Sequence, residues 1–250
     1  LDETPVYFDV TEDNSTEESG VTVVKVDKPN MAQKGTITVE KTGEVFFGVS
    51  VIGGVDESGN ELPTIYQPQY EKRGLPGAVY EIIAAEDIIT QDGTVRNQKG
   101  EVVDTVVTDE NGTAVSRELY LGKYEVREIT APHGMVLNPE PHCVELVYAG
   151  QNVAVTETAT SFENERQKVE ISLVKSIEQN ERFGIGNNGE MKNISFGLFA
   201  AEEIVSASGT SIPTDGLVEI ISLNEDGTAK IKTDLPFGSY YVQELATDSH

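Results

Sequence analysis

The chain has 250 residues, of which 38% are hydrophobic, and this is enough apolar material for folded cores. Its 43 acidic and 18 basic residues give a formal net charge of −25, which repels phosphate backbones and anionic membrane surfaces. We therefore expect no nucleic-acid partner and, because no apolar run reaches about 18 residues, no direct membrane insertion. The single cysteine, Cys143, excludes an intrachain disulfide and is expected to be an incidental strand residue.

Glycine and proline separate short stretches rich in Val, Ile, Thr and Tyr, and no sustained helical periodicity is found. This pattern predicts an all-β architecture. Asx-Gly signals at 56–60, 90–94, 109–113 and 224–228 predict hairpin turns or loops between strands. The best candidate helix, 81–89, also fits a buried strand that runs into a turn, and we favour the strand.

The chain also repeats itself. "YLGKYEVRE" at 120–128 matches "PFGSYYVQE" at 236–244, with an offset of 244 − 128 = 116. "GTITVEK" at 35–41 corresponds to "KVEISLVK" at 168–175, with an offset of 175 − 41 = 134. The difference, 134 − 116 = 18, is a net insertion in the first copy, which we place in the region of 53–74.

These offsets predict three segments. Residues 1–30 are expected to be the C-terminal tail of a preceding, incomplete repeat. Residues 31–166 are expected to form a complete β-sandwich, and residues 167–250 a second repeat that lacks its last strand. The repeat organisation therefore predicts tandem copies of one β domain.

The complete copy places three polar side chains among apolar ones. Alternate residues of a strand point to the same side, and Lys41, Glu128 and Asn164 each fall on the apolar side of their strand. A lone buried charge costs several kcal/mol, so an inward lysine and an inward glutamate should pair or lose their charges. Desolvation favours the neutral amine and the neutral acid.

A neutral amine is a nucleophile, and a protonated carboxyl group can polarise an amide and pass a proton to the leaving ammonia. The three groups therefore have the chemistry for an amide between Lys41 and Asn164, formed once inside the protein. The alternative is a buried Lys41–Glu128 ion pair beside a hydrogen-bonding asparagine. A competing assignment uses Lys25, which also follows alternating valines, and we rank it second because too few residues separate it from Lys41 for a domain.

The preceding and following copies each contain some of the corresponding lysine, glutamate and asparagine residues. Lys175 and Glu244 fall on the apolar sides of their strands in the second copy, whose asparagine partner would lie outside this chain. Asn30 precedes Lys41 by 41 − 30 = 11 residues, and Asn164 precedes Lys175 by 175 − 164 = 11 residues. Asn30 is therefore expected to be the asparagine of the preceding repeat.

The segments "TVEKTGE", "GLPGAVYEI", "GKYEVREITAPHG" and "SFENE" resemble the Cna B-type or SpaA-type prealbumin-like repeats of Gram-positive surface adhesins and pilins. The resemblance covers most of 31–250 and implies tandem prealbumin-like (inverse Ig-like) β-sandwich repeats. It also implies a spontaneous isopeptide bond, with Lys41 as the nucleophile, Asn164 as the electrophile and Glu128 as the catalytic acid. Lys175 and Glu244 are the corresponding residues of the second repeat.

The function we predict is a structural stalk or adhesin segment of a bacterial cell-surface protein, extracellular and anchored to the cell wall through a segment outside these residues. Its expected partners are neighbouring repeats of the same chain. The alternative is a ligand-binding adhesin module, in which the insertion at 53–74, with Tyr66, Gln67, Gln69 and Tyr70, contacts a host extracellular protein or glycan.

We expect no enzyme beyond a single-turnover self-crosslinking reaction, no cofactor and no metal. "GIGNNG" at 184–189 satisfies a dinucleotide-binding pattern, but no helix pattern follows it. The Asp/Asn/Gly turns lack the ligand series of a calcium loop. His133, His142 and His250 show no metal-ligand spacing.

Overall fold

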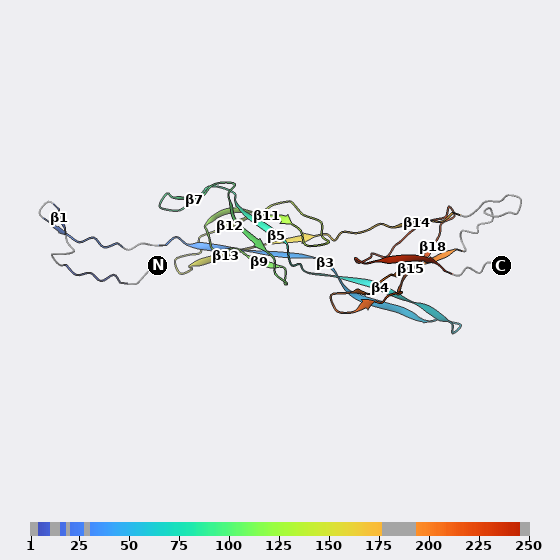
Figure 1. Ribbon diagram of the computed structural model, residues 1–250. Coiled ribbons are helices and arrows are strands. Elements are labelled where there is room, and N and C mark those ends of the chain that lie inside the picture. Colours follow the sequence, from blue (N-terminus) through green and yellow to red (C-terminus); the bar gives the residue numbers. More distant parts are fainter. Residues whose placement is uncertain (1–4, 11–15, 19–20, 28–30, 177–193, 246–250) are drawn as a thin grey trace. The chain divides into compact units, whose positions relative to one another are not determined.

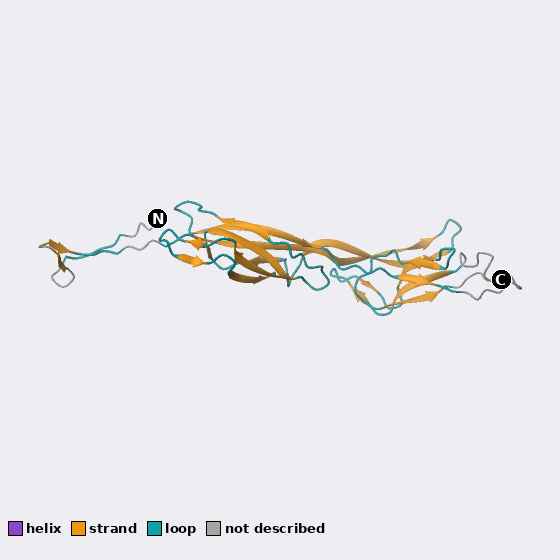
Figure 2. Ribbon diagram, turned by 90° about the horizontal axis from the view of Figure 1, so that it is seen from above, coloured by secondary structure: helices purple, strands orange, loops and turns teal. Residues whose placement is uncertain are grey.

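A computed structural model describes residues 5–10, 16–18, 21–27, 31–176 and 194–245. Within these ranges the chain forms strands, turns and loops and no helix (Figure 2), which confirms the all-β prediction. It follows that none of the described residues belongs to a helix of membrane-spanning length and hydropathy. Near the start, β1 (Thr16–Glu18) and β2 (Val21–Val23) form a two-stranded antiparallel sheet.

The chain folds into two compact units that alternate along the sequence. The first is drawn from residues 1–41, 75–132 and 137–162, and the second from residues 42–74, 133–136 and 163–250. These units follow spatial contacts and not the sequence repeats. The predicted repeat boundaries therefore stay a prediction.

The first unit is built mainly from two sheets (Figure 1), and it also contains the small two-stranded sheets β1–β2 and β6–β7. One main sheet has the order β12–β11–β5–β8 and is antiparallel throughout, and in the other main sheet β3 pairs with β9, β10 and β13. The strands are β3 (Lys34–Val55, up to Lys41 in this unit), β5 (Val79–Ala84), β6 (Ile88–Ile89), β7 (Val95–Asn97), β8 (Val102–Val107), β9 (Thr113–Val115), β10 (Leu119–Tyr120), β11 (Gly122–Thr130), β12 (His142–Leu146) and β13 (Val155–Asn164, up to Phe162 in this unit).

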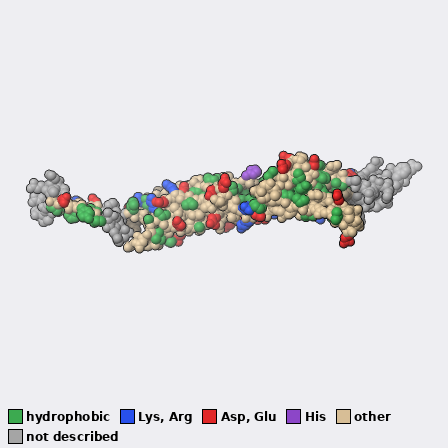
Figure 3. All heavy atoms as spheres, turned by 90° about the horizontal axis from the view of Figure 1, so that it is seen from below, with side chains coloured by type: hydrophobic (Ala, Val, Ile, Leu, Met, Phe, Trp, Pro, Cys, Tyr) green, Lys and Arg blue, Asp and Glu red, His purple; other side chains and the backbone are tan. Residues whose placement is uncertain are grey.

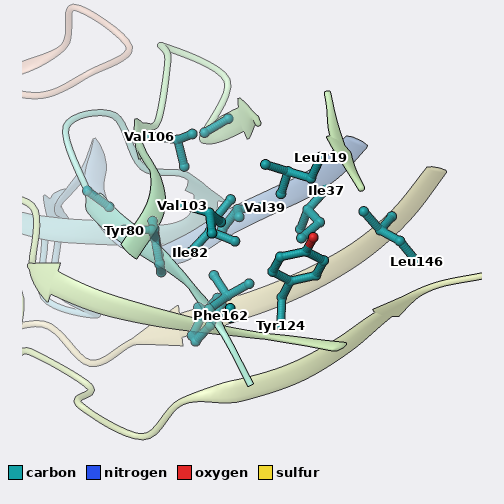
Figure 4. Close-up of a cluster of buried hydrophobic side chains, with 14 of the residues drawn as sticks. Ile37, Val39, Tyr80, Ile82, Val103, Val106, Leu119, Tyr124, Leu146 and Phe162 are labelled. Atoms are coloured by element: carbon teal, nitrogen blue, oxygen red, sulfur yellow. The ribbon is translucent and has the colours of Figure 1, made fainter. Parts of the chain in front are cut away.

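The core of the first unit lies between these sheets (Figure 4). Burial alternates strictly along the start of β3, where Ile37 and Val39 are fully buried. The facing sheet contributes Tyr80 and Ile82 from β5 and Tyr124 from β11, all fully buried. Because burial in a strand recurs at every second residue, the same side of β3 continues inward to Lys41.

All four predicted turns are confirmed. They connect β3 to β4, β6 to β7, β8 to β9 and β18 to β19. At the first turn Asp56 Oδ1 accepts hydrogen bonds from the backbone N–H groups of Ser58 and Asn60, at 2.9 and 2.8 Å. The stretch 81–89 forms the end of β5, a bend and β6, so the strand interpretation is confirmed.

The second unit has a sheet of order β3–β4–β18–β15–β20 and two small sheets, β14–β19 and β16–β17. Its own core includes Leu198, Ile212 and Val218, each at most 1% exposed. The strands besides β3 are β4 (Glu61–Gly74), β14 (Ser172–Val174), β15 (Ser195–Ala200), β16 (Ile204–Val205), β17 (Ser211–Ile212), β18 (Leu217–Ser222), β19 (Thr228–Lys230) and β20 (Tyr240–Glu244).

The sequence insertion is part of this second unit. β3 and β4 form a hairpin whose register runs from Thr42 opposite Gly74 to Val55 opposite Glu61. Three side chains of the hairpin pack against the second core, those of Phe46, Val49 and Tyr66. In Figure 1 the hairpin accordingly lies beside β15 and β18.

Each unit contains its own copy of one local hydrogen bond, and the two copies lie 116 residues apart in the sequence. The Tyr124 hydroxyl donates to the carbonyl of Tyr120 at 2.6 Å, and the Tyr240 hydroxyl donates to the carbonyl of Pro236 at 2.9 Å. These matching bonds support the tandem-repeat organisation, which stays a prediction. In the view of Figure 3 acidic side chains are dispersed over the described surface, in keeping with the net charge of −25.

Candidate functional site: a buried lysine–glutamate pair

Lys41 lies at the end of the inward-facing series of β3 and is 1% exposed. Its backbone is held on both sides, because its N–H donates to the Gly112 carbonyl at 2.7 Å and its carbonyl accepts from the Leu75 N–H at 3.0 Å. These bonds fix the direction of the side chain. The prediction that Lys41 points into the core is confirmed.

Glu128 comes from the other sheet, where it lies opposite Tyr80 in the register of β11 and β5. Lys41 Nζ and Glu128 Oε1 are 2.8 Å apart, and both side chains are fully buried. The other carboxylate oxygen, Oε2, accepts a hydrogen bond from the backbone N–H of Asn138 at 3.1 Å. The structure thus brings together two of the predicted site residues, Lys41 and Glu128.

Aromatic rings surround the ammonium group. Lys41 Nζ lies 5.8 Å from the ring centre of Tyr80 and 5.8 Å from that of Phe162, and the two ring centres are 4.8 Å apart. The His142 ring stacks on Phe162 at 3.9 Å. The pair is therefore buried beside aromatic rings, where its electrostatic interactions are stronger than at the surface.

Burial is the dominant influence on the ionisation of this site. It lowers the pKa of Lys41, while the hydrogen bond and charge of Glu128 act in the opposite direction. Burial also raises the pKa of Tyr80, and the nearby Glu128 carboxylate raises it further. The environment therefore favours a neutral amine at Lys41 and a protonated phenol at Tyr80.

Asn164 is the last residue of β13 and is 3% exposed. It shares its buried side of the strand with Phe162, which is 2% exposed, while Glu163 between them is exposed. The predicted inward direction of Asn164 is confirmed. Asn30, His250 and the stretch 184–189 lie outside the described residues.

The second predicted pair forms but is not buried. Lys175 Nζ and Glu244 Oε2 are 2.7 Å apart, with side chains 30% and 41% exposed. Val242, which precedes Glu244 on the same side of β20, is 38% exposed. The expectation that the second copy buries its glutamate is therefore wrong. Among the described residues β14 pairs only with β19, and β20, which carries Glu244, pairs only with β15.

The competing lysine does not occupy a buried position either. Lys25 lies beyond the end of β2 and is exposed. Two contributors to the site were missed in the sequence. Tyr80 could have been found, because it shares the inward side of its strand with Ile82 and is a buried phenol that needs a partner. Asn138 contributes a backbone N–H, for which the sequence carries no signal.

The tyrosine side chains of the insertion at 53–74 make contacts within the second unit. Tyr66 packs against the second core, and the Tyr70 hydroxyl donates to the Asp234 carbonyl at 3.2 Å. The Arg166 guanidinium lies 3.9 Å from the Tyr70 ring centre. Gln67 and Gln69 are exposed. Both tyrosines are therefore taken up by packing in the second unit, which leaves the ligand-binding alternative with less support.

The second unit also has a mainly apolar cavity of about 310 Å³, lined by residues that include Phe46, Tyr70, Leu235 and Phe237. Arg166 borders it and forms an ion pair with Asp234. Over the ranges described, no group of three or more His, Cys, Asp or Glu side chains is placed to hold a metal ion. Cys143 is an exposed residue of β12, as expected of an incidental strand cysteine.

Comparison with known proteins finds a family model that matches the part of the chain containing Glu128, while Lys41 and Asn164 lie outside the matched range. Residues 67–161 match the family model described as the SpaA prealbumin-like fold domain. The trypsin-resistant surface T6 protein of Streptococcus pyogenes serotype M6 is 26% identical over 147 residues, which cover 57% of this chain and 26% of that protein.

Two solved structures show lower similarity. The Bacillus anthracis TIE protein is 18% identical, with a TM-score of 0.42, over 86% of this chain and 46% of that chain. The full-length major pilin SpaD from Corynebacterium diphtheriae is 17% identical, with a TM-score of 0.35, over 82% of this chain and 52% of that chain. The chain thus spans about a quarter of the curated relative and about half of these two structures. Residues 67–161 are thus similar to the SpaA prealbumin-like fold domain, and the matched range includes Glu128.

Proposed function

We propose that this chain is a structural segment of a stalk or adhesin on the surface of a Gram-positive bacterium, strengthened by an isopeptide bond between Lys41 and Asn164. The observation that carries the proposal is the Lys41–Glu128 pair, 2.8 Å apart and with both side chains fully buried. The SpaA domain match, a relative that is a streptococcal surface protein and a solved pilin structure support the cell-surface assignment.

The chemistry follows from the ionisation of the pair. The Lys41 ammonium passes one proton to the Glu128 carboxylate, which gives a neutral amine and a neutral acid. The amine then attacks Asn164 Cγ. The Nζ–Cγ bond forms, the Cγ–Nδ2 bond breaks, and Glu128 relays the proton of the attacking nitrogen to the departing nitrogen. The products are one secondary amide and one ammonia, so no external reactant is needed.

The position of Asn164 in the fold supports its role as the electrophile. β13 pairs with β3, the strand that carries Lys41. Lys41 Nζ lies 5.8 Å from the ring centre of Phe162, the buried residue two positions before Asn164 on the same side of β13. A carboxamide at the next inward position of that strand is a suitable partner for the amine.

Such a bond would tie the first and last strands of the predicted repeat 31–166. The closed loop spans 164 − 41 = 123 positions. By analogy with disulfide loops, closing it contributes about 5 kcal/mol to the free energy of unfolding. Unlike a disulfide, it does not depend on redox potential, which suits an extracellular protein with one cysteine. Asn30, Lys175 and Glu244 are proposed to serve the preceding and following repeats in the same way.

Intact-mass analysis of the full chain tests the bond. The wild-type mass should be lower than the sequence mass by one ammonia, and fragmentation should yield a branched peptide joining Lys41 and Asn164. Lys41→Ala and Glu128→Ala should restore the full mass after correction for each substitution. Lys175→Ala is the matched control and should keep the deficit. A wild-type chain with the full sequence mass would leave a plain ion pair and overturn the proposal.

A further inference from the structure

The Tyr80 hydroxyl is an unusual feature of the buried site. The residue is fully buried, and its hydroxyl oxygen has no hydrogen-bond partner among the described residues. Nearly all buried polar groups in folded proteins have a partner, so an exception of this kind asks for an explanation. Tyr124, the other fully buried tyrosine of this core, follows the rule, since its hydroxyl donates to the Tyr120 carbonyl at 2.6 Å.

The Tyr80 hydroxyl lies next to the Glu128 carboxyl group, which loses its Lys41 ammonium partner in the proposed reaction. Tyr80 stands opposite Glu128 in the strand register, and Lys41 Nζ lies 5.8 Å from its ring centre. In the resting pair, Glu128 Oε1 faces the Lys41 ammonium at 2.8 Å, and Oε2 accepts from the Asn138 N–H. When the Lys41 ammonium gives its proton to Oε1, the carboxyl group loses its cationic partner.

We propose that Tyr80 is a positioning residue for the Lys41–Asn164 reaction, whose hydroxyl becomes the hydrogen-bond donor to Glu128 once the ammonium has given up its proton. This inference rests on the function proposed above. The Lys41 proton goes to Oε1, so a Tyr80 donor to Oε2, beside the Asn138 N–H, leaves the acidic O–H on Oε1 and holds the acid in one orientation toward the carboxamide. Tyr80 itself exchanges no atom in the reaction.

The state of the phenol fits this role. Burial and the Glu128 carboxylate raise the pKa of Tyr80, so the hydroxyl keeps its proton and remains a donor. Lys41 on β3 faces Glu128, and His142 on β12 stacks on the Phe162 ring. Neither offers a hydroxyl that could replace Tyr80.

The reaction rate tests the proposal. Unreacted full-length chain is recovered from inclusion bodies in urea and diluted into buffer. Folding is followed by circular dichroism, and ammonia loss by mass after quenching in acid. Tyr80→Phe should slow ammonia loss by about ten- to a hundredfold, the usual effect of one hydrogen bond to an ionisable group. Tyr124→Phe, the same change in the same core, should react at the wild-type rate once folded.

A spectroscopic measurement separates positioning from packing. In the reacted wild-type chain, the Tyr80 hydroxyl proton should give a slowly exchanging, downfield NMR resonance that is lost in Tyr80→Phe and kept in Tyr124→Phe. If Tyr80→Phe does not fold, 3-fluorotyrosine at position 80 retains the hydroxyl as a stronger donor. It should move this resonance further downfield and leave the reaction intact.

The outcomes distinguish the two proposals. A wild-type chain that never loses ammonia overturns the isopeptide bond and this inference together. A wild-type chain that loses ammonia, with Tyr80→Phe reacting equally fast, overturns the role of Tyr80 and leaves the bond standing. A reacted chain whose Tyr80 hydroxyl resonance is that of an unbonded phenol has the same meaning.

Discussion

Two lysine–glutamate pairs occupy corresponding positions in the sequence, and they differ in exposure while agreeing in distance. The pair Lys41–Glu128 spans 2.8 Å with both side chains fully buried, and the pair Lys175–Glu244 spans 2.7 Å with side chains 30% and 41% exposed. Contact distance alone therefore does not describe such a pair. The surrounding strands decide whether the charges are screened by water.

The difference in covering strands is visible in the topology. In the first unit β3 pairs with β9, β10 and β13, and the facing sheet closes over Lys41. In the second unit, as far as the structure describes it, β14 pairs with β19 alone. The same local sequence pattern thus gives a buried ion pair in one case and a partly exposed ion pair in the other.

The largest effect is expected when each pair loses its cation. In an Asn164→Ala background, which keeps the amine free, Lys41→Met leaves the Glu128 charge alone at a buried site, and we expect it to lower the free energy of unfolding by about 3–5 kcal/mol. Lys175→Met should cost less than about 1 kcal/mol, because Glu244 remains hydrated. Urea unfolding, with hydrogen exchange to assign each transition to a unit, measures both. Equal costs would show that exposure does not distinguish the pairs.

The next largest effect on stability is expected for Gly122 and Gly238, which are separated by the repeat offset of 116 residues. A Cβ on Gly122 would lie 2.5 Å from Ile88 Cδ1, and one on Gly238 would lie 2.6 Å from Ile204 Cδ1. Gly122 also has a φ of 149°, which side chains rarely adopt. Gly122→Ala should cost about 1–3 kcal/mol and Gly238→Ala less than about 1 kcal/mol. Thermal unfolding measures the difference, and a costlier Gly238→Ala would contradict it.

A smaller effect is expected from the two matched tyrosines. Tyr124→Phe leaves the Tyr120 carbonyl without its donor inside a fully buried core and should cost about 1 kcal/mol. Tyr240→Phe removes the corresponding bond to Pro236 at a half-buried position, where water can replace the donor, and should cost about half as much. Urea unfolding of the two variants side by side tests the ranking.

The smallest effect is expected from pH and requires a chain that keeps a free amine, such as Asn164→Ala. Burial lowers the pKa of Lys41 in the folded state, whereas the unfolded amine holds its proton up to its usual value of 10.5. Between these values the unfolded chain binds more protons, so stability should rise with pH. Adding Lys41→Met should remove this rise, and a slope that persists would assign it to other groups.

Side-chain alternation predicted much of the site. It placed Lys41, Glu128 and Asn164 on the apolar sides of their strands, and all three residues are buried. It failed for Glu244, since alternation tells which side of a strand a residue faces and not whether another layer covers that side. The Asx-Gly turns were predicted because their backbone requirements are local.

Other features depended on contacts distant in sequence. The length of the insertion was clear from the repeat offsets, yet nothing local in Tyr66 or Tyr70 shows that they pack in the second unit. The Asn138 N–H at Glu128 is set by the path of the backbone, which no side-chain pattern reveals. The role of Tyr80 required knowledge that its hydroxyl lacks a partner.

The hairpin of β3 and β4 has a consequence for biosynthesis. It leaves the ribosome early, but the core against which Phe46, Val49 and Tyr66 pack includes β18 and β20, which are translated up to Glu244. At ordinary elongation rates this interval is on the order of ten to thirty seconds. During that time these apolar side chains have no native partner, so the nascent chain must be kept from aggregating until translation reaches the last strand.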